Sequence, residues 1–283
     1  MTAVKEFIMK IIFLLSALVS IIAVALICLF LFKNGVAAIV EIGPQEFLLG
    51  TKWAPKQELF GVLPMIVGSI YVTVGAIVVG VPIALLTAVF MAKFCPPQLY
   101  KILKPAVELL AGIPSIVYGF FGLVVIVPII REIFGGGGKG ILTASIMLGI
   151  MILPSIIGVA ESAIRAVPES YFEGALALGA TKERSVFAAV LPAAKSGIFA
   201  GVILGIGRAI GETMAVVMIA GNQPIIPDEI TDGVRTLTAN VVLEMGYATG
   251  LHREALIATA VVLFVFVLII NLSFSLLKGR KDA

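Results

Sequence analysis

Charged residues are scarce in this chain of 283 residues, since Asp, Glu, Lys and Arg together make up 13% of it. Soluble globular domains carry about 25%. The net charge of +3 is spread along the chain, so we expect no nucleic-acid partner. The chain has one histidine, and its two cysteines, Cys28 and Cys95, show neither metal-ligand nor CxxC spacing. We therefore predict no metal site and no disulfide framework.

A nucleotide-binding motif is also missing. The glycine run 135–138 leads into Lys139 and Gly140, but it lacks the Ser or Thr that follows Lys in a Walker A loop. No other segment of the sequence has that pattern. We therefore expect a non-enzymatic chain without a cofactor. Any ATP hydrolysis on which it depends belongs to another protein.

Long apolar runs dominate what is present. Hydrophobic residues make up 60% of the chain, and the mean hydropathy is +1.15. A helix that crosses a bilayer needs about 20 such residues. We predict an all-α integral membrane protein, surrounded by lipid, in which residues 1–283 form one domain of six transmembrane helices. The expected spans are about 11–32, 64–92, 109–130, 141–160, 198–220 and 255–277, and the expected loops are 33–60, 93–105, 161–197 and 221–254.

The distribution of lysine and arginine predicts the orientation. Six spans place both termini and the segments 93–105 and 161–197 on one side of the membrane. That side holds twelve of the 20 basic residues and the other side holds seven, while Arg208 lies within a span. Cytoplasmic loops carry the excess of basic residues. We therefore expect a multi-pass protein of a bacterial or archaeal plasma membrane, with both termini and the 161–197 segment in the cytoplasm.

The 161–197 segment has local signals for two helices. Ser170 and Glu173 have the spacing of a capping box, which predicts the start of the first helix. Gly179 stands where that helix needs a left-handed residue after its end. Thr181 is placed to cap the second helix, and Leu191-Pro192 is expected to end it.

The same segment resembles a known motif. Glu173-Gly174-Ala175, then Gly179, then Leu191-Pro192 is similar to the EAA loop of ABC-importer permeases. The resemblance implies that these residues form a coupling helix and its support, docked in a groove of a partner ATPase. Two positions depart from the pattern: Gly174 stands where Ala is usual, and Ala189 where a larger aliphatic residue is usual. The alternatives are a helix that only joins two spans, or a chance likeness to a soluble helix-turn-helix.

The span at 198–220 contains two charged residues, Arg208 and Glu212. Their i, i+4 spacing would place them on one face of a helix, where they can pair. Charges inside a membrane are costly and usually face a protein interior or a water-filled path. A guanidinium group matches the geometry of an oxyanion such as phosphate. The pair therefore indicates an anion site, and a purely structural ion pair is the alternative.

Two stretches carry a more specific resemblance. Residues 111–119, AGIPSIVYG, and 207–214, GRAIGETM, resemble the signatures of phosphate ABC-transporter permeases, most closely the first of the two permease subunits. The similarity covers most of residues 60–277. It implies a type I ABC importer fold, a second permease subunit, two ATP-binding ATPase subunits and an external phosphate-binding protein. It also implies that Arg208 and Glu212 lie on the phosphate path, and we expect Pro114 and Tyr118 to line or shape it. A simple kink is the alternative for Pro114.

Other functions remain open at the level of the sequence. One is an ABC permease for another oxyanion, such as sulfate or molybdate. Another is a channel or secondary transporter that works alone, although the chain shows no clear internal repeat of the kind that such transporters often have. A third is a membrane scaffold. Co-purification with an ATPase and competition among oxyanions for uptake would separate these functions.

Overall fold

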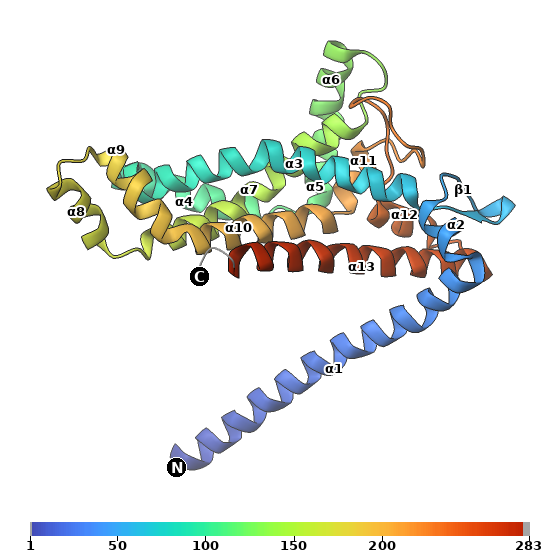
Figure 1. The fold of residues 1–283 in the computed structure, drawn as a ribbon, viewed down its shortest axis with the longest axis horizontal. Coiled ribbons are helices and arrows are strands. Elements are labelled where there is room, and N and C mark those ends of the chain that lie inside the picture. Colours follow the sequence, from blue (N-terminus) through green and yellow to red (C-terminus); the bar gives the residue numbers. More distant parts are fainter. Residues whose placement is uncertain (1, 280–283) are drawn as a thin grey trace.

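The computed structural model describes residues 2–279, with side chains described for residues 5–273. Within these residues, six helical stretches are long and apolar enough to cross a membrane, as the sequence predicts. Their helices are α1 (Thr2–Ile42), α3 (Leu63–Val89), α5 (Ser115–Phe121) with α6 (Val127–Phe134), α7 (Ile141–Arg165), α10 (Leu191–Gly211) and α13 (Gly250–Gly279). Helices α3, α7, α10 and α13 run alongside one another in a bundle, while α1 diverges from it and α6 projects from it (Figure 1).

Helix α7 is the centre of the bundle, because 67% of its apolar window is buried, against 33% or less for the other five stretches. Helix α3 packs along it at close range. A Cβ on Gly80 of α3 would lie 2.7 Å from the carbonyl oxygen of Gly149 on α7, so only glycine fits there. Met147, Met151 and Ile152 of α7 fill the core beside this contact.

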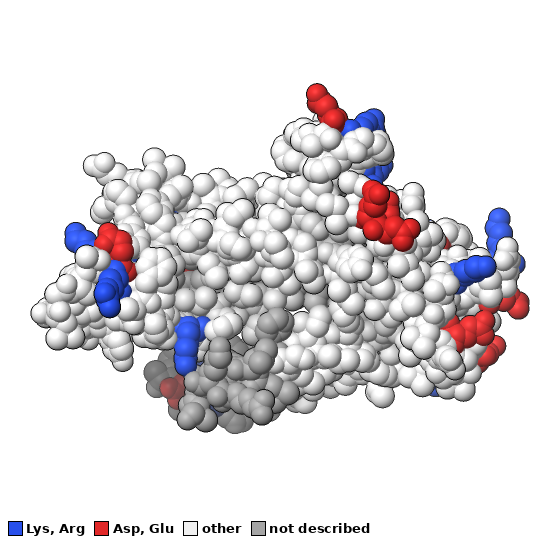
Figure 2. Space-filling view, turned by 45° about the horizontal axis from the view of Figure 1, so that its top comes forward, with Lys and Arg blue, Asp and Glu red and all other residues white. Residues whose placement is uncertain are grey.

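Charged side chains leave a wide face of the bundle free. Figure 2 shows them gathered toward the two ends and on the projecting tip, with an uncharged band between. One end of the bundle carries α8 (Glu169–Ala177) and α9 (Lys182–Ser185), and the other carries α2 (Pro44–Leu49) and a hairpin (Figure 1). The hairpin pairs β1 (Trp53–Ala54) with β2 (Leu59–Phe60) across a 3-10 turn, η1 (Pro55–Gln57). This distribution fits an apolar belt within the membrane and two ends that are exposed to water.

The predicted first span, 11–32, lies within a longer helix, and the expected loop 33–60 was wrong at its start. Helix α1 continues to Ile42, because no proline interrupts it before Pro44. Its apolar window is entirely exposed, and burial begins near Gly35, where the helix meets Val261 of α13. Figure 1 shows α1 diverging from the bundle.

The predicted third span, 109–130, was also misplaced. Helix α4 (Pro97–Gly112) occupies most of the expected loop 93–105 and ends before Pro114. It has no buried residue, and Lys101, Lys104 and Glu108 follow one another at spacings of three and four residues. The stretch that is long and apolar enough to cross a membrane runs from Ser115 to Phe134 through a π-helical turn, η3 (Gly122–Ile126).

Three further expectations need correction. Leu191-Pro192 does not end a helix, because α9 continues through the π-helical turn η4 (Val186–Val190) into α10, where Pro192 occupies the first turn and needs no backbone donor. The span at 198–220 is broken, since α10 ends at Gly211 and a short helix, α11 (Met214–Ile219), follows. The loop 221–254 contains α12 (Leu237–Glu244). A π-helical turn, η2 (Phe90–Phe94), extends α3.

Candidate functional site: a charged cavity and a two-helix loop

Arg208 lies on α10 and points toward α7. Its Nη1 donates a hydrogen bond of 3.0 Å to Ser155 Oγ. Both side chains line a cavity of about 670 Å³, together with Asn271 of α13 and apolar groups of α10. The prediction that Arg208 pairs with Glu212 was wrong, since no ion pair joins them among the described side chains, residues 5–273. No carboxylate among the described side chains forms an ion pair with this guanidinium.

Glu212 does not share a helical face with Arg208, because α10 stops one residue before it. The backbone of Glu212 is extended, with φ −69° and ψ 133°. Its carboxylate accepts a hydrogen bond of 3.2 Å from the backbone N–H of Ala215, and its carbonyl accepts one of 3.0 Å from Thr238 Oγ1. Glu212 thus caps the start of α11 and holds α12 beside it. Gly211, a poor helix former at the last position of α10, was the available signal for the break.

Pro114 and Tyr118 lie at a second break, between α4 and α5. Pro114 precedes α5 with an extended backbone, and Tyr118 is buried at 6% exposure. The Tyr118 hydroxyl donates a hydrogen bond of 2.8 Å to the carbonyl of Leu110, which ties α5 back to α4. Neither residue lines the cavity at Arg208, and Pro114 borders a separate cavity of about 620 Å³ beside Glu108. The four expected path residues therefore do not line one common cavity.

The predicted coupling motif forms helix α8 and the turn after it. Glu173 and Gly174 are exposed and Ala175 is half-buried. The expected capping box was wrong, since α8 begins at Glu169, after Pro168, with no side-chain cap. Gly179 has φ +85°, which confirms the left-handed turn.

The second helix of the motif begins as predicted. The Thr181 hydroxyl accepts a hydrogen bond of 3.3 Å from the backbone N–H of Arg184, which confirms the cap.

Helix α8 is anchored to the bundle at its first turn. Lys93 of η2 forms an ion pair of 2.8 Å with Glu169, and its ammonium lies 5.4 Å from the centre of the Phe172 ring. Phe172 and Leu191 pack against a buried cluster formed by α3, α7 and η4. Leu191 therefore packs against the same buried cluster that holds Phe172 of α8, while Glu173 and Gly174 are exposed.

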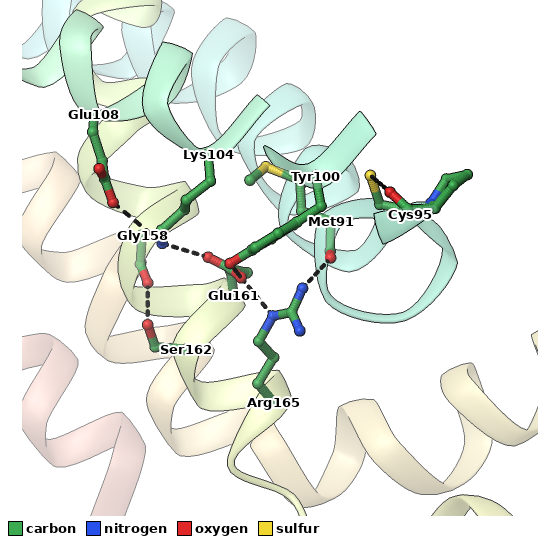
Figure 3. A network of polar contacts seen from close by, with 10 residues as sticks. Met91, Cys95, Tyr100, Lys104, Glu108, Gly158, Glu161, Ser162 and Arg165 are labelled. Carbon is green, nitrogen blue, oxygen red and sulfur yellow. Dashed lines mark hydrogen bonds and ion pairs between the residues drawn. The ribbon is translucent and has the colours of Figure 1, made fainter. Parts of the chain in front are cut away.

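A network of polar contacts stands between this loop and the core (Figure 3). Its centre is Glu161 of α7, whose side chain is 1% exposed. The carboxylate accepts hydrogen bonds from Tyr100 at 2.8 Å, from Lys104 at 2.7 Å and from Arg165 at 2.6 Å. Arg165 also donates to the carbonyl of Met91 at 2.7 Å, and its guanidinium lies 4.3 Å from the centre of the Tyr100 ring. The network joins α4, α7 and η2 around one buried charge.

The contacts with Glu161 keep Lys104 protonated and charged, and they keep Tyr100 protonated and neutral. The hydrogen bond to Glu161 raises the pKa of Lys104, although partial burial opposes that shift. The hydrogen bond to the same carboxylate, with burial, raises the pKa of Tyr100. Removing one partner of a buried ion pair typically costs 3–5 kcal/mol. This network was not predicted, and the i, i+4 spacing of Glu161 and Arg165 is a local signal for part of it.

A second buried carboxylate, Glu244, lies at the opposite end of the bundle. It accepts hydrogen bonds from Trp53 at 2.9 Å and Arg235 at 2.6 Å, and its other contact is His252 Nε2 at 2.8 Å. Burial alone would raise the pKa of Glu244, but the hydrogen bonds of Trp53, His252 and Arg235 outweigh burial and lower it. Glu244 thereby fastens the hairpin to α12 and α13.

Solved structures with a similar fold identify the architecture. One is a structure titled "Inward facing conformations of the MetNI methionine ABC transporter: CY5 native crystal form". It matches with a TM-score of 0.61 at 21% identity, over 81% of this chain and 99% of that chain. The crystal structure of an amino acid ABC transporter with histidines matches with a TM-score of 0.53 at 19% identity, over 77% and 94%. The fold is that of a type I ABC importer permease.

Sequence comparison gives the family. Residues 80–282 match the family described as "Binding-protein-dependent transport system inner membrane component", and the chain belongs to that family. The "Probable ABC transporter permease protein YqgH" of Bacillus subtilis (strain 168) is 37% identical over 272 residues, 94% of this chain and 88% of that protein. The "Phosphate transport system permease protein PstC" of Pasteurella multocida (strain Pm70) is 34% identical over 264 residues, 83% and 82%. The chain is a multi-pass inner-membrane transport subunit.

Proposed function

We propose that this chain is a permease subunit of an ATP-driven importer for inorganic phosphate. The observation that carries the proposal is Arg208, which pairs with no carboxylate among residues 5–273 and lines a cavity within the spanning bundle of a chain that belongs to an importer family. The phosphate transport permeases of Pasteurella multocida and Haemophilus influenzae, 34% and 35% identical to it, support phosphate as the substrate.

Arg208 supplies the positive charge that an anion needs in a region of low dielectric. Its guanidinium stays protonated at every physiological pH and offers two parallel donors to an oxyanion. Glu212 shapes the path by capping α11, and Tyr118 shapes it by fixing the break between α4 and α5. Pro114 sets that break, since it precedes α5.

Helix α8 couples the membrane domain to ATP hydrolysis by a partner. Its exposed residues Glu173 and Gly174, with Ala175, form the surface that meets an ATPase, and the turn at Gly179 sets its angle. Leu191 and Pro192 belong to the support beneath α8. The excess of basic residues supports a cytoplasmic position for both termini and for this loop, in one membrane domain that spans the chain.

The complete importer contains further chains. The path lies between this permease and a second, related one, two ATPase subunits hydrolyse ATP, and an external binding protein delivers phosphate. This arrangement accounts for the absence of a Walker A motif in the sequence.

Uptake of radiolabelled phosphate by cells with and without this chain tests the proposal. The expected result is that uptake depends on the chain, and that excess sulfate or molybdate does not compete. Strong competition by sulfate or molybdate would assign the chain to another oxyanion. Uptake without an associated ATPase in the purified protein would assign it to a stand-alone transporter.

A further inference from the structure

The cavity at Arg208 collects polar groups from three helices on an otherwise apolar lining. Arg208 comes from α10, Ser155 from α7 and Asn271 from α13. The rest of the lining consists of Ala200, Ile203, Leu204 and Gly207, all on α10. Among the residues with described side chains, 5–273, no acidic residue lines the cavity. Three separate helices therefore direct polar side chains into one apolar space, and nothing in the lining repels an anion.

Ser155 keeps an unused hydrogen-bond donor. Its Oγ accepts from Arg208, and its own hydroxyl proton has no acceptor among the described side chains and backbone. Hydroxyl groups in the spanning helices commonly donate to the carbonyl one turn earlier, which satisfies them within the helix. The following residues do so here: Ser16, Ser20, Thr87, Ser162, Thr259 and Ser273. Ser155 departs from this pattern at the cavity.

Asn271 and Arg208 also have hydrogen-bonding groups that no described residue uses. Asn271 stands in the apolar helix α13 and makes no hydrogen bond within residues 5–273, although a carboxamide offers two donors and an acceptor. Arg208 uses one of its five N–H donors, toward Ser155. Unpaired polar groups within a membrane are costly, so a partner for all three is expected in the working protein.

We propose that the cavity between α7, α10 and α13 is an oxyanion-binding site in which Ser155 and Asn271 join Arg208 in holding the substrate. The proposal rests on the proposed function and names two further residues of that transport path. Arg208 supplies charge, Ser155 donates its free proton while it orients the guanidinium, and the Asn271 amide donates from the opposite helix. At about 30 Å³ per water, a cavity of about 670 Å³ has room for a tetrahedral oxyanion that keeps part of its hydration shell.

The test is phosphate uptake by the complete importer in proteoliposomes, supplied with its binding protein. Ser155→Ala and Asn271→Leu should each lower the maximal rate per assembled complex at least tenfold, about 1.4 kcal/mol. Ser155→Thr, which keeps the hydroxyl, should retain most of the rate. Matched controls are Ser162→Ala on α7 and Ser273→Ala on α13, whose hydroxyls bond within their own helices. Both should behave as wild type.

The outcomes separate this inference from the proposed function. Failure of the wild-type importer to take up phosphate would refute the proposed function itself. Active wild type, inactive Arg208→Ala and unchanged rates for Ser155→Ala and Asn271→Leu would overturn the site alone. Loss of the second permease from the purified complex in Asn271→Leu, with a normal rate per remaining complex, would make Asn271 an interface residue and also overturn it. The two substitutions lie on different helices. If one variant fails to assemble, the uptake rate of the other still tests the site.

Discussion

The buried carboxylate of Glu161 makes an asymmetric prediction about stability. Its side chain is 1% exposed, whereas Lys104 is 30% exposed and Arg165 is 44% exposed. Lys104→Met keeps the alkyl chain but leaves the carboxylate with Arg165 and Tyr100, and we expect a loss of about 3 kcal/mol, the low end for a broken buried pair. Glu161→Gln leaves cations that water can reach, so we expect a smaller loss of about 1–2 kcal/mol.

Because the two residues act on each other, their effects should not add. Once Glu161→Gln has removed the negative charge, Lys104→Met has no buried anion to strand, and the double variant should lose at least about 1 kcal/mol less than the sum of the singles. The assay is the free energy of unfolding of the purified permease in mixed micelles, by denaturant titration. Lys101→Met, on the exposed surface of the same helix, is the control. Additive losses of unfolding free energy in the double variant would refute the reasoning. So would a loss for Lys104→Met that is no larger than the loss for Lys101→Met.

Three other predictions follow from single contacts. Gly179→Ala places a side chain at φ +85°, where L-residues are strained, and should lower coupled transport while membrane insertion persists. Gly174→Ala, also in open space but within a helix, should leave transport unchanged. Equal transport by the two variants would show that the left-handed turn is not needed. Glu212→Ala should destabilise the protein by about 1 kcal/mol through loss of the α11 cap, and Glu212→Gln by less, in thermal unfolding. The lowered pKa of Glu244 contributes stability at neutral pH that should be lost as the pH falls below its ordinary value of 4.5, and acid titration of Glu244→Gln should lack that loss.

The spans were predictable because their physical signal is local. A bilayer demands about 20 apolar residues in succession, and such runs are visible in the sequence. Their edges were less predictable. Composition alone did not separate the surface helix α4 from the crossing that starts at Ser115, because both contribute to an apolar stretch around Pro114. The turn at Gly179 and the cap at Thr181 were predictable for the same reason as the spans, since each depends on residues within one turn.

The site depended on contacts that the sequence does not display. The i, i+4 rule for Arg208 and Glu212 assumes one continuous helix, and α10 ends between them. Ser155 is 53 residues from Arg208 in the chain, and Tyr100 is 61 residues from Glu161, so neither contact has a local pattern. Only the packing of α4, α7 and α10 brings these groups together.

The most direct test of the account is ATP-dependent phosphate uptake by proteoliposomes that contain the complete importer with Arg208→Ala, Arg208→Lys or the wild-type chain. Arg208→Ala removes the charge that compensates the anion, so it should nearly abolish uptake at matched protein levels. Arg208→Lys keeps the charge without the bidentate fork and should give partial uptake at best. Wild-type rates in Arg208→Ala would contradict the account, because they would show that the cavity and its guanidinium do not lie on the path of the anion.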